Sequence, residues 1–149
     1  MTNSQAYVIS KAFRMPSDSS KRYVQCKTNI NLGIARGQKG RYVARIQEVL
    51  NVAGFEREVF EHFTLKPYGV NQDPWWVRAY LQTHGAWPLA CNGNFGTNTA
   101  MAVKYFKLLY EIPLTGDGGS IGPKTIERLD ACAWEYENDH PAHTWVEGW

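Results

Sequence analysis

The chain has 149 residues, which suits one domain of ordinary size or a small domain with an extension. Its apolar content of 44% is sufficient for a hydrophobic core, and its aromatic content of 13% is high because there are six Trp and eight Tyr. No apolar stretch approaches the roughly 20 residues needed to cross a bilayer. The first dozen residues lack a basic segment followed by an apolar run. We therefore expect neither a membrane partner nor a secretory signal, and synthesis in the cytoplasm.

The net charge of +2 is unevenly distributed along the chain. Residues 1–55 hold nine Lys and Arg against two acidic residues, whereas residues 56–149 hold seven against twelve. A basic N-terminal third suits an anionic partner such as nucleic acid, a wall polymer or an acidic protein face, and it is equally typical of a solvated surface. No nucleic-acid-binding motif accompanies the charge, so no nucleic-acid partner is expected.

The three cysteines, Cys26, Cys91 and Cys132, cannot all pair within one chain. They include no Cys-x-x-Cys pair of the kind that binds zinc. Free and mostly buried thiols are the simplest interpretation, and the spacing leaves a disulfide between any two of them open.

Residues 1–40 are interpreted as a basic N-terminal extension. Residues 6–13 are weakly strand-like, and the alternation in residues 22–27 (RYVQCK) suits a second short strand, so a β-hairpin is an option here. Residues 33–40 (GIARGQKG) are rich in glycine but lack the Gly-Lys-Ser/Thr ending of a phosphate-binding loop. We predict a flexible connector for this segment.

Two stretches then compete as the first helix of a bundle. From Arg41 an apolar stripe predicts a helix that ends at Gly54, with Arg41, Arg45 and Glu48 off the stripe; its members are Val43, Ile46, Val49, Leu50 and Ala53. A second stripe predicts a helix over residues 76–85, formed by Val77, Tyr80, Leu81 and His84. Between them, residues 56–63 add a helical turn or two and residues 66–69 form a turn.

Residues 92–129 contain the same short pattern twice. Each copy opens with Asn-Gly or Asp-Gly, which favours a tight turn, and continues with a buried-type residue and a Gly just before a helical pattern. In the second copy Pro123 fits the first position of the helix, where its missing N–H costs nothing. The apolar faces of the two helices are formed by Ala102, Val103, Phe106 and Leu109, and by Ile126, Leu129 and Ala133.

This arrangement resembles the peptidoglycan-binding domain family, whose pattern is Asp-Gly-x-Phe-Gly-Pro-x-Thr, then Ala-Val-x-x-Phe-Gln, then Leu-x-x-Asp-Gly-x-x-Gly-Pro-x-Thr. The matching residues are Gly93, Phe95, Gly96, Thr99, Ala102, Val103, Phe106, Leu114, Asp117, Gly118, Gly122, Pro123 and Thr125. The chain departs from the pattern where Asn92 replaces Asp, Thr97 replaces Pro and Lys107 replaces Gln, and its second turn has one extra residue. Residues 43–55 also look like the first helix of the family.

We prefer residues 76–85 as the first helix of the domain because the connection to the first turn is then short. The predicted fold is mainly α: a compact three-helix bundle like the peptidoglycan-binding domain, with an N-terminal extension that contains one further helix and the optional hairpin. The predicted division is 1–40 (extension), 41–72 (additional helix and connector), 73–137 (peptidoglycan-binding-like domain) and 138–149 (aromatic tail). The tail is too short for its own core, so it either frays, docks on this chain or docks on another.

Catalytic and metal sites have weak support. Glu56, Glu58, Glu61 and Asp73, near His62 and Tyr68, could supply an acid–base pair, but the chain offers no lobes to hold two carboxylates across a sugar. His140 and His143 lie near Glu135, Glu137 and Asp139 in the sequence and could suggest a metal, but because they flank Pro141 in the predicted tail we expect no preformed site. Cys91 beside Asn92 is interpreted as a packed thiol. We expect no catalytic residues, no metal and no cofactor.

The resemblance implies a ligand site in a shallow groove between helices, and peptidoglycan as the partner. Amide, hydroxyl, aromatic and basic side chains suit its N-acetyl groups, sugar faces and peptide carboxylates. The candidate ligand-binding residues around the first turn and helix are Asn92, Asn94, Thr97, Asn98, Lys104, Tyr105 and Tyr110. Turn formation and helix capping are the simpler role for each polar residue alone.

Three functions remain open at this point. The first is a non-catalytic peptidoglycan-binding module that acts at the bacterial cell wall, as part of a bacteriophage virion, a tail or an injection apparatus. The second is a structural assembly protein that keeps the fold for contacts with other subunits, through the extension and the tail. The third is a small cell-wall hydrolase.

Overall fold

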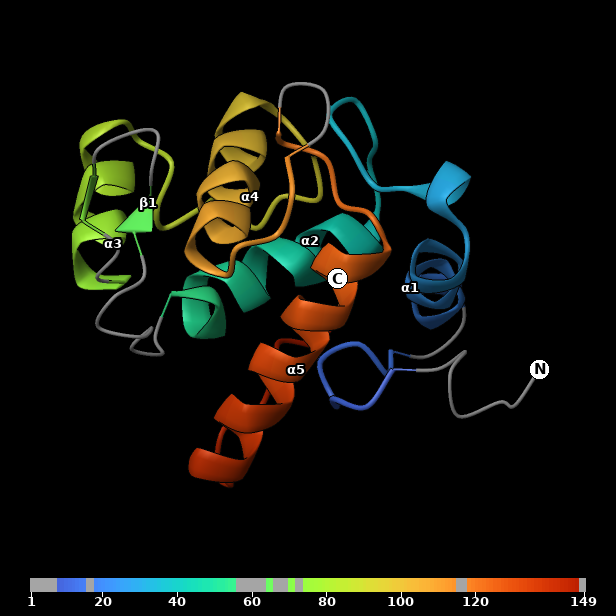
Figure 1. Cartoon of the computed structure of the whole chain (residues 1–149). Coiled ribbons are helices and arrows are strands. Elements are labelled where there is room, and N and C mark those ends of the chain that lie inside the picture. Colours follow the sequence, from blue (N-terminus) through green and yellow to red (C-terminus); the bar gives the residue numbers. More distant parts are fainter. Residues whose placement is uncertain are drawn as a thin grey trace.

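A computed structural model describes residues 8–15, 18–55, 64–65, 70–71, 74–114 and 118–147. The protein is mainly helical, as predicted (Figure 1). The helices are α1 (Asp18–Thr28), the short 3-10 helix η2 (Ile30–Leu32), α2 (Arg41–Val49) with its π-helical continuation η3 (Leu50–Gly54), α3 (Pro74–Thr83), α4 (Thr97–Leu109) and α5 (Pro123–Asp139). Strand β1 (Thr64–Leu65) pairs in antiparallel fashion with β2 (Val70–Asn71), with Thr64 opposite Asn71.

The apolar faces predicted for the helices form a single buried cluster. This cluster runs from Val8 to Trp145 and crosses every predicted domain boundary. The predicted core residues of α2 with η3, α4 and α5 are all at most 3% exposed: Val43, Ile46, Val49, Leu50, Ala53, Ala102, Val103, Phe106, Leu109, Ile126, Leu129 and Ala133. Burying such a large set of side chains is the main force that holds these helices together.

The two repeated turns enter their helices with nearly the same backbone angles. Gly96, before α4, has φ −106° and ψ −166°, and Gly122, before α5, has φ −105° and ψ −168°. The apolar residue that precedes each glycine, Phe95 or Ile121, is buried. Pro123 is the first residue of α5, as predicted.

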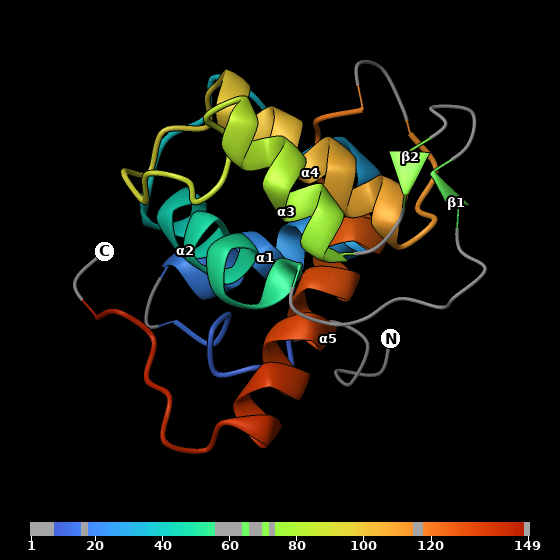
Figure 2. The same ribbon diagram turned by 90° about the vertical axis from the view of Figure 1, so that its left-hand side faces the viewer.

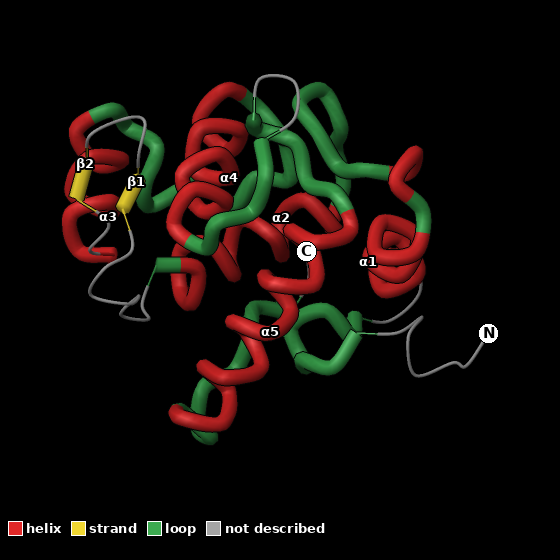
Figure 3. The backbone as a smooth tube through the Cα atoms, in the orientation of Figure 1, coloured by secondary structure: helices red, strands yellow, loops and turns green. Residues whose placement is uncertain are grey.

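The segment predicted to be a flexible connector, residues 33–40, instead joins both turns. Ile34 and Ile121 exchange two backbone hydrogen bonds of 2.9 and 2.7 Å, and Gly40 N–H donates to the Gly93 carbonyl over 2.9 Å. Phe95 is bonded through its N–H to the Gln38 carbonyl and through its carbonyl to the Gly37 N–H. Figure 3 shows these loops gathered above α2. The prediction was wrong because backbone groups in a turn need partners, and this segment supplies them.

The packing does not support residues 76–85 as the first helix of the bundle. Helix α2 and η3 lie against α5, and η3 also contacts α4, whereas α3 packs against α4. All residues from Val43 to Leu50 are buried, but Gln82 and Thr83 at the end of α3 and His84 just after it are exposed. A short connection to the first turn had favoured residues 76–85, but burial of the apolar stripe places α2 in the core of the bundle instead.

The hairpin considered for the N-terminal extension is absent from its described residues. Residues 22–27 belong to α1, because Tyr23 and Cys26 lie three positions apart and are both buried on one helix face. The Tyr23 ring packs edge-on against Phe13, with 4.6 Å between ring centroids. The two-stranded pair of this protein lies elsewhere, at β1 and β2.

The described part of the C-terminal tail docks on its own chain (Figure 2). Trp145 is 8% exposed, and its indole N–H donates to Glu137 over 2.6 Å. The Val146 N–H donates to Glu48 and the Val146 carbonyl accepts from Arg45. Arg45 and Glu48, placed off the apolar stripe by the sequence, are thus buried at 5% and 6% exposure.

The N-terminal segment, residues 9–12, is held by carboxylates of α5. Asp130, 2% exposed, accepts hydrogen bonds from the Ile9 N–H and from the N–H and hydroxyl of Ser10, at 2.6 to 2.9 Å. Glu137 accepts from the next two backbone N–H groups. We call Arg45, Glu48, Asp130 and Glu137 the terminal clasp, since together they bind both end segments. In the described residues, no helix is long and apolar enough to cross a membrane.

Candidate functional site

A shallow hollow of about 250 Å³ opens beside the first repeated turn, and four of the seven predicted ligand-binding residues line it. We call it the turn hollow. Its lining comprises Gln47, Gly85, Leu89, Ala90, Asn92, Asn94, Gly96, Thr97, Asn98 and Thr99. The turn, the start of α4, the side of α2 and the loop after α3 thus contribute to one concave surface.

Gln47 of α2 fixes the shape of the turn hollow. Its side chain is 1% exposed. Its amide nitrogen donates to the Asn94 carbonyl over 2.9 Å and to the Thr99 hydroxyl over 3.0 Å, and its amide oxygen accepts from the Gly93 N–H over 3.0 Å. Asn92 closes the turn by accepting from the Asn94 N–H over 2.9 Å. The buried side-chain amide of Gln47 therefore supplies hydrogen-bond partners for the backbone of the turn.

Three polar side chains of the turn hollow remain available to a ligand. Asn94, Thr97 and Asn98 are exposed, and their side chains have no hydrogen-bond partner within the part of the chain that the structure describes. Gly96 is the N-cap residue of α4 and has no side chain, and no side-chain hydrogen bond caps this helix. None of the three side chains is therefore occupied in capping α4. Two amides and one hydroxyl facing a shallow surface can donate and accept hydrogen bonds simultaneously.

The other three predicted ligand-binding residues lie outside the turn hollow. Lys104 packs its stem against the second turn at Gly118. The Tyr105 ring lies 4.9 Å from that of Tyr80 on α3. Tyr110, near the end of α4, packs on Phe106 and lies under the Arg128 guanidinium, 5.2 Å from the ring centroid. The helical pitch spreads these residues along α4, away from the turn.

Sequence reasoning missed Gln47, Gly85 and Leu89 as parts of this surface. Gln47 carried a signal, since it lies beside the apolar stripe of a helix that proved to be central. Gly85 and Leu89 had none, because their position depends on how the loop after α3 folds back toward α2. That fold-back is fixed by Asn51, whose side chain bonds the N–H and the carbonyl of Leu89 at 2.7 and 2.9 Å.

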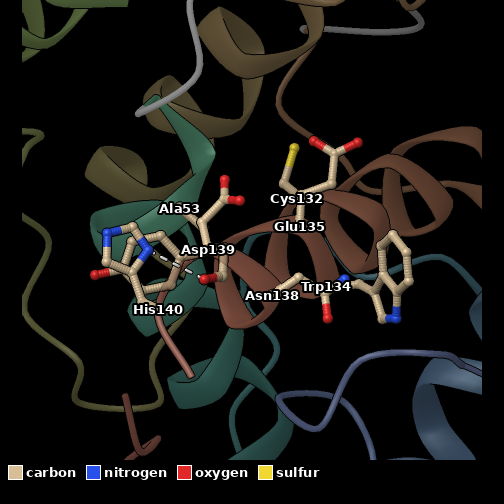
Figure 4. Close-up of a pocket in the computed structure, with 8 residues that line it drawn as sticks. Ala53, Cys132, Trp134, Glu135, Asn138, Asp139 and His140 are labelled. Atoms are coloured by element: carbon tan, nitrogen blue, oxygen red, sulfur yellow. Dashed lines mark hydrogen bonds between the residues drawn. The ribbon is translucent and has the colours of Figure 1, made fainter. Parts of the chain in front are cut away.

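A second hollow, of about 410 Å³, contains part of the candidate metal-binding region (Figure 4). His140 stacks on Tyr136, with 4.1 Å between ring centroids, and its Nδ1 lies 3.1 Å from the Tyr136 carbonyl oxygen. His143 packs edge-on against Tyr136 and Trp145. Among the described residues, no three His, Cys, Asp or Glu side chains are grouped to hold a metal ion.

The remaining candidates for chemistry are thiols and carboxylates. Cys26, Cys91 and Cys132 are free thiols. Burial, together with repulsion from Glu48, raises the pKa of Cys91, which keeps the thiol protonated and makes it a poor nucleophile. The carboxylates proposed for acid–base catalysis, Glu56, Glu58, Glu61 and Asp73, lie outside the described residues, as do His62 and Tyr68.

Comparisons of the chain with family models, curated proteins and solved structures find no match.

Proposed function

We propose that the protein is a non-catalytic module that binds peptidoglycan through the turn hollow. The observation that carries this proposal is the grouping of three exposed and unengaged polar side chains, Asn94, Thr97 and Asn98, on a turn whose backbone is already satisfied by Gln47. A polar surface held rigid from below can bind a ligand at little cost in conformational entropy.

The chemistry of the turn hollow suits an N-acetylated sugar. The amide groups of Asn94 and Asn98 can pair with N-acetyl amides, and the Thr97 hydroxyl can pair with sugar hydroxyls. Leu89 and Ala90 in the same lining provide apolar surface for the sugar face. A volume of about 250 Å³ fits a sugar unit of a polymer better than a large free ligand. The module would act at the bacterial cell wall or within a virion or secretion assembly that reaches it.

The repeat itself supplies a sharp test. Thr97 and Asn98 occupy the positions that Pro123 and Lys124 occupy in the second turn. Because Gly96 and Gly122 have almost the same backbone angles, Thr97→Pro should preserve the start of α4 while removing the hydroxyl. Combined with Asn98→Ala, it should weaken sedimentation with purified sacculi by about tenfold, since each lost hydrogen bond contributes about 0.5–1.5 kcal/mol.

The matched control is Lys124→Ala, an exposed change at the equivalent position of the second turn. We expect this variant to sediment with sacculi as the original protein does, and both variants to keep the original helical circular dichroism spectrum. Equal sedimentation of the double variant and the control would refute the turn hollow as the site. No sedimentation of the original protein at low salt would refute wall binding itself.

An assembly role is the second candidate, and exposed apolar residues favour it. Ile30 and Leu32 of η2 are 78% and 41% exposed, which suits a protein contact better than a polymer contact. The described end segments, which the sequence suggested as arms for such contacts, lie on α5 and α2 instead. Sedimentation velocity with and without Ile30→Ser would detect self-association through η2. A protein that sediments with sacculi and stays monomeric would contradict this candidate.

A further inference from the structure

A third hollow, of about 540 Å³, lies where the two end segments meet the start of α2. Lys11 and Arg14 line it from the N-terminal segment, Arg41 and Arg45 from α2, and His143 and Trp145 from the tail. We call it the basic hollow. It lies apart from the turn hollow, with which it shares no lining residue.

The charge of the basic hollow is only partly compensated. Arg45 is engaged, because it donates to the carbonyls of Ala12 and Val146 and lies 3.0 Å from a Glu48 oxygen. Lys11 and Arg41 are exposed, and neither has a side-chain partner among the described residues. Glu147 is the one carboxylate in the described lining. Two cations from different segments thus line the same hollow as Glu147, and neither is paired with a side chain among the described residues.

The walls of the basic hollow are suited to an organic ligand. The Trp145 indole is held by its hydrogen bond to Glu137, and the Arg45 guanidinium lies 6.0 Å from the centroid of the Trp145 ring. Met15 adds apolar surface to the lining. The Nε2 atom of His143 is buried and finds no partner in the described part of the chain. Because His143 lines the same hollow as Lys11 and Arg41, its unsatisfied ring nitrogen is a further group that a bound anion could satisfy.

We propose that the basic hollow binds a small organic anion with at least two negative charges, carried by phosphate or carboxylate groups. Arg41 can form a bidentate pair with either group, and Lys11 supplies a second point charge. The volume is that of a small-molecule site. The cations line one hollow rather than forming a stripe along the surface, which favours a small anion over a nucleic acid. This proposal does not rest on the proposed function.

The test is isothermal titration of the full chain, at constant ionic strength in a phosphate-free buffer, with inorganic pyrophosphate and separately with tricarballylate. The double variant Lys11→Gln/Arg41→Gln is compared with the double variant Lys39→Gln/Lys124→Gln. The second removes the same charge from exposed positions outside the basic hollow. We expect saturable binding that weakens about tenfold or more in the first variant and stays nearly unchanged in the second. Binding of pyrophosphate alone identifies phosphate, and binding of tricarballylate alone identifies carboxylate.

Location is measured independently in the original protein by the indole N–H resonance of Trp145, assigned with Trp145→Phe. A saturable shift of this resonance with the same affinity supports the basic hollow even if the charge variant fails to fold. Equal weakening in both charge variants would show nonspecific charge screening and overturn the proposal. Binding of a single-stranded oligonucleotide without binding of either small anion would also overturn it, as would the absence of saturable binding by any probe.

Discussion

Replacing Gln47 tests whether one buried amide holds the first repeated turn in place. Gln47→Leu keeps the approximate size of the side chain but leaves the buried Gly93 N–H without an acceptor, which costs about 1–3 kcal/mol. The Asn94 carbonyl and the Thr99 hydroxyl lose their donor, at about 0.5–1.5 kcal/mol each. Additional apolar burial by Leu returns about 1 kcal/mol. The expected net loss in the free energy of unfolding is about 3 kcal/mol.

Urea unfolding followed by far-ultraviolet circular dichroism measures this loss. A domain of this kind has a stability of about 5–15 kcal/mol, so the variant should still fold and its midpoint should fall clearly. The control is Gln82→Leu, the same chemical change at an exposed position of α3, which should leave the midpoint within experimental error. A loss below about 1 kcal/mol for Gln47→Leu would refute the role of this amide, because one uncompensated buried N–H alone costs that much.

Two further changes probe the terminal clasp and the buried thiol. Asp130→Asn replaces one of the two accepting carboxylate oxygens by an NH2 group, which then faces a backbone N–H donor. We expect the free energy of unfolding to fall by about 2 kcal/mol and tryptic cleavage after Lys11 to become faster. The control Asp139→Asn, at an exposed position, should change neither. Burial raises the pKa of Cys26 from 9.0 to about 11, and burial also raises that of Tyr23. Each group binds its proton more tightly when folded, so stability is intact below about pH 9 and falls as the pH rises toward 11; a urea midpoint that is constant over this range would contradict the assignment.

The sequence determined α2, α4 and α5 because their signal is local, whereas residues 22–27 of α1 were predicted to be a strand. Apolar residues that recur every three or four positions identify the buried face of α4 and α5 without any knowledge of their neighbours. The repeated turns could also be predicted from the sequence, because Asn-Gly or Asp-Gly and the Gly before each helix favour one backbone geometry wherever they occur. Four of the seven candidate ligand residues lie together in the turn hollow for the same reason: Asn92, Asn94, Thr97 and Asn98 are neighbours in the chain.

Tertiary structure decided everything that depends on distant pairs. Residues 33–40 have the sequence of a flexible connector, and only the backbone hydrogen bonds between Ile34 and Ile121 show that the segment is held in place. Ser10 and Asp130 are separated by 120 positions, so no local pattern connects them. Arg45 is a surface residue by periodicity and is buried only because the two end segments cross it. A hydrogen bond between remote segments depends on which backbone groups are left unpaired after the helices pack, and that is a property of the assembled fold rather than of any stretch of sequence.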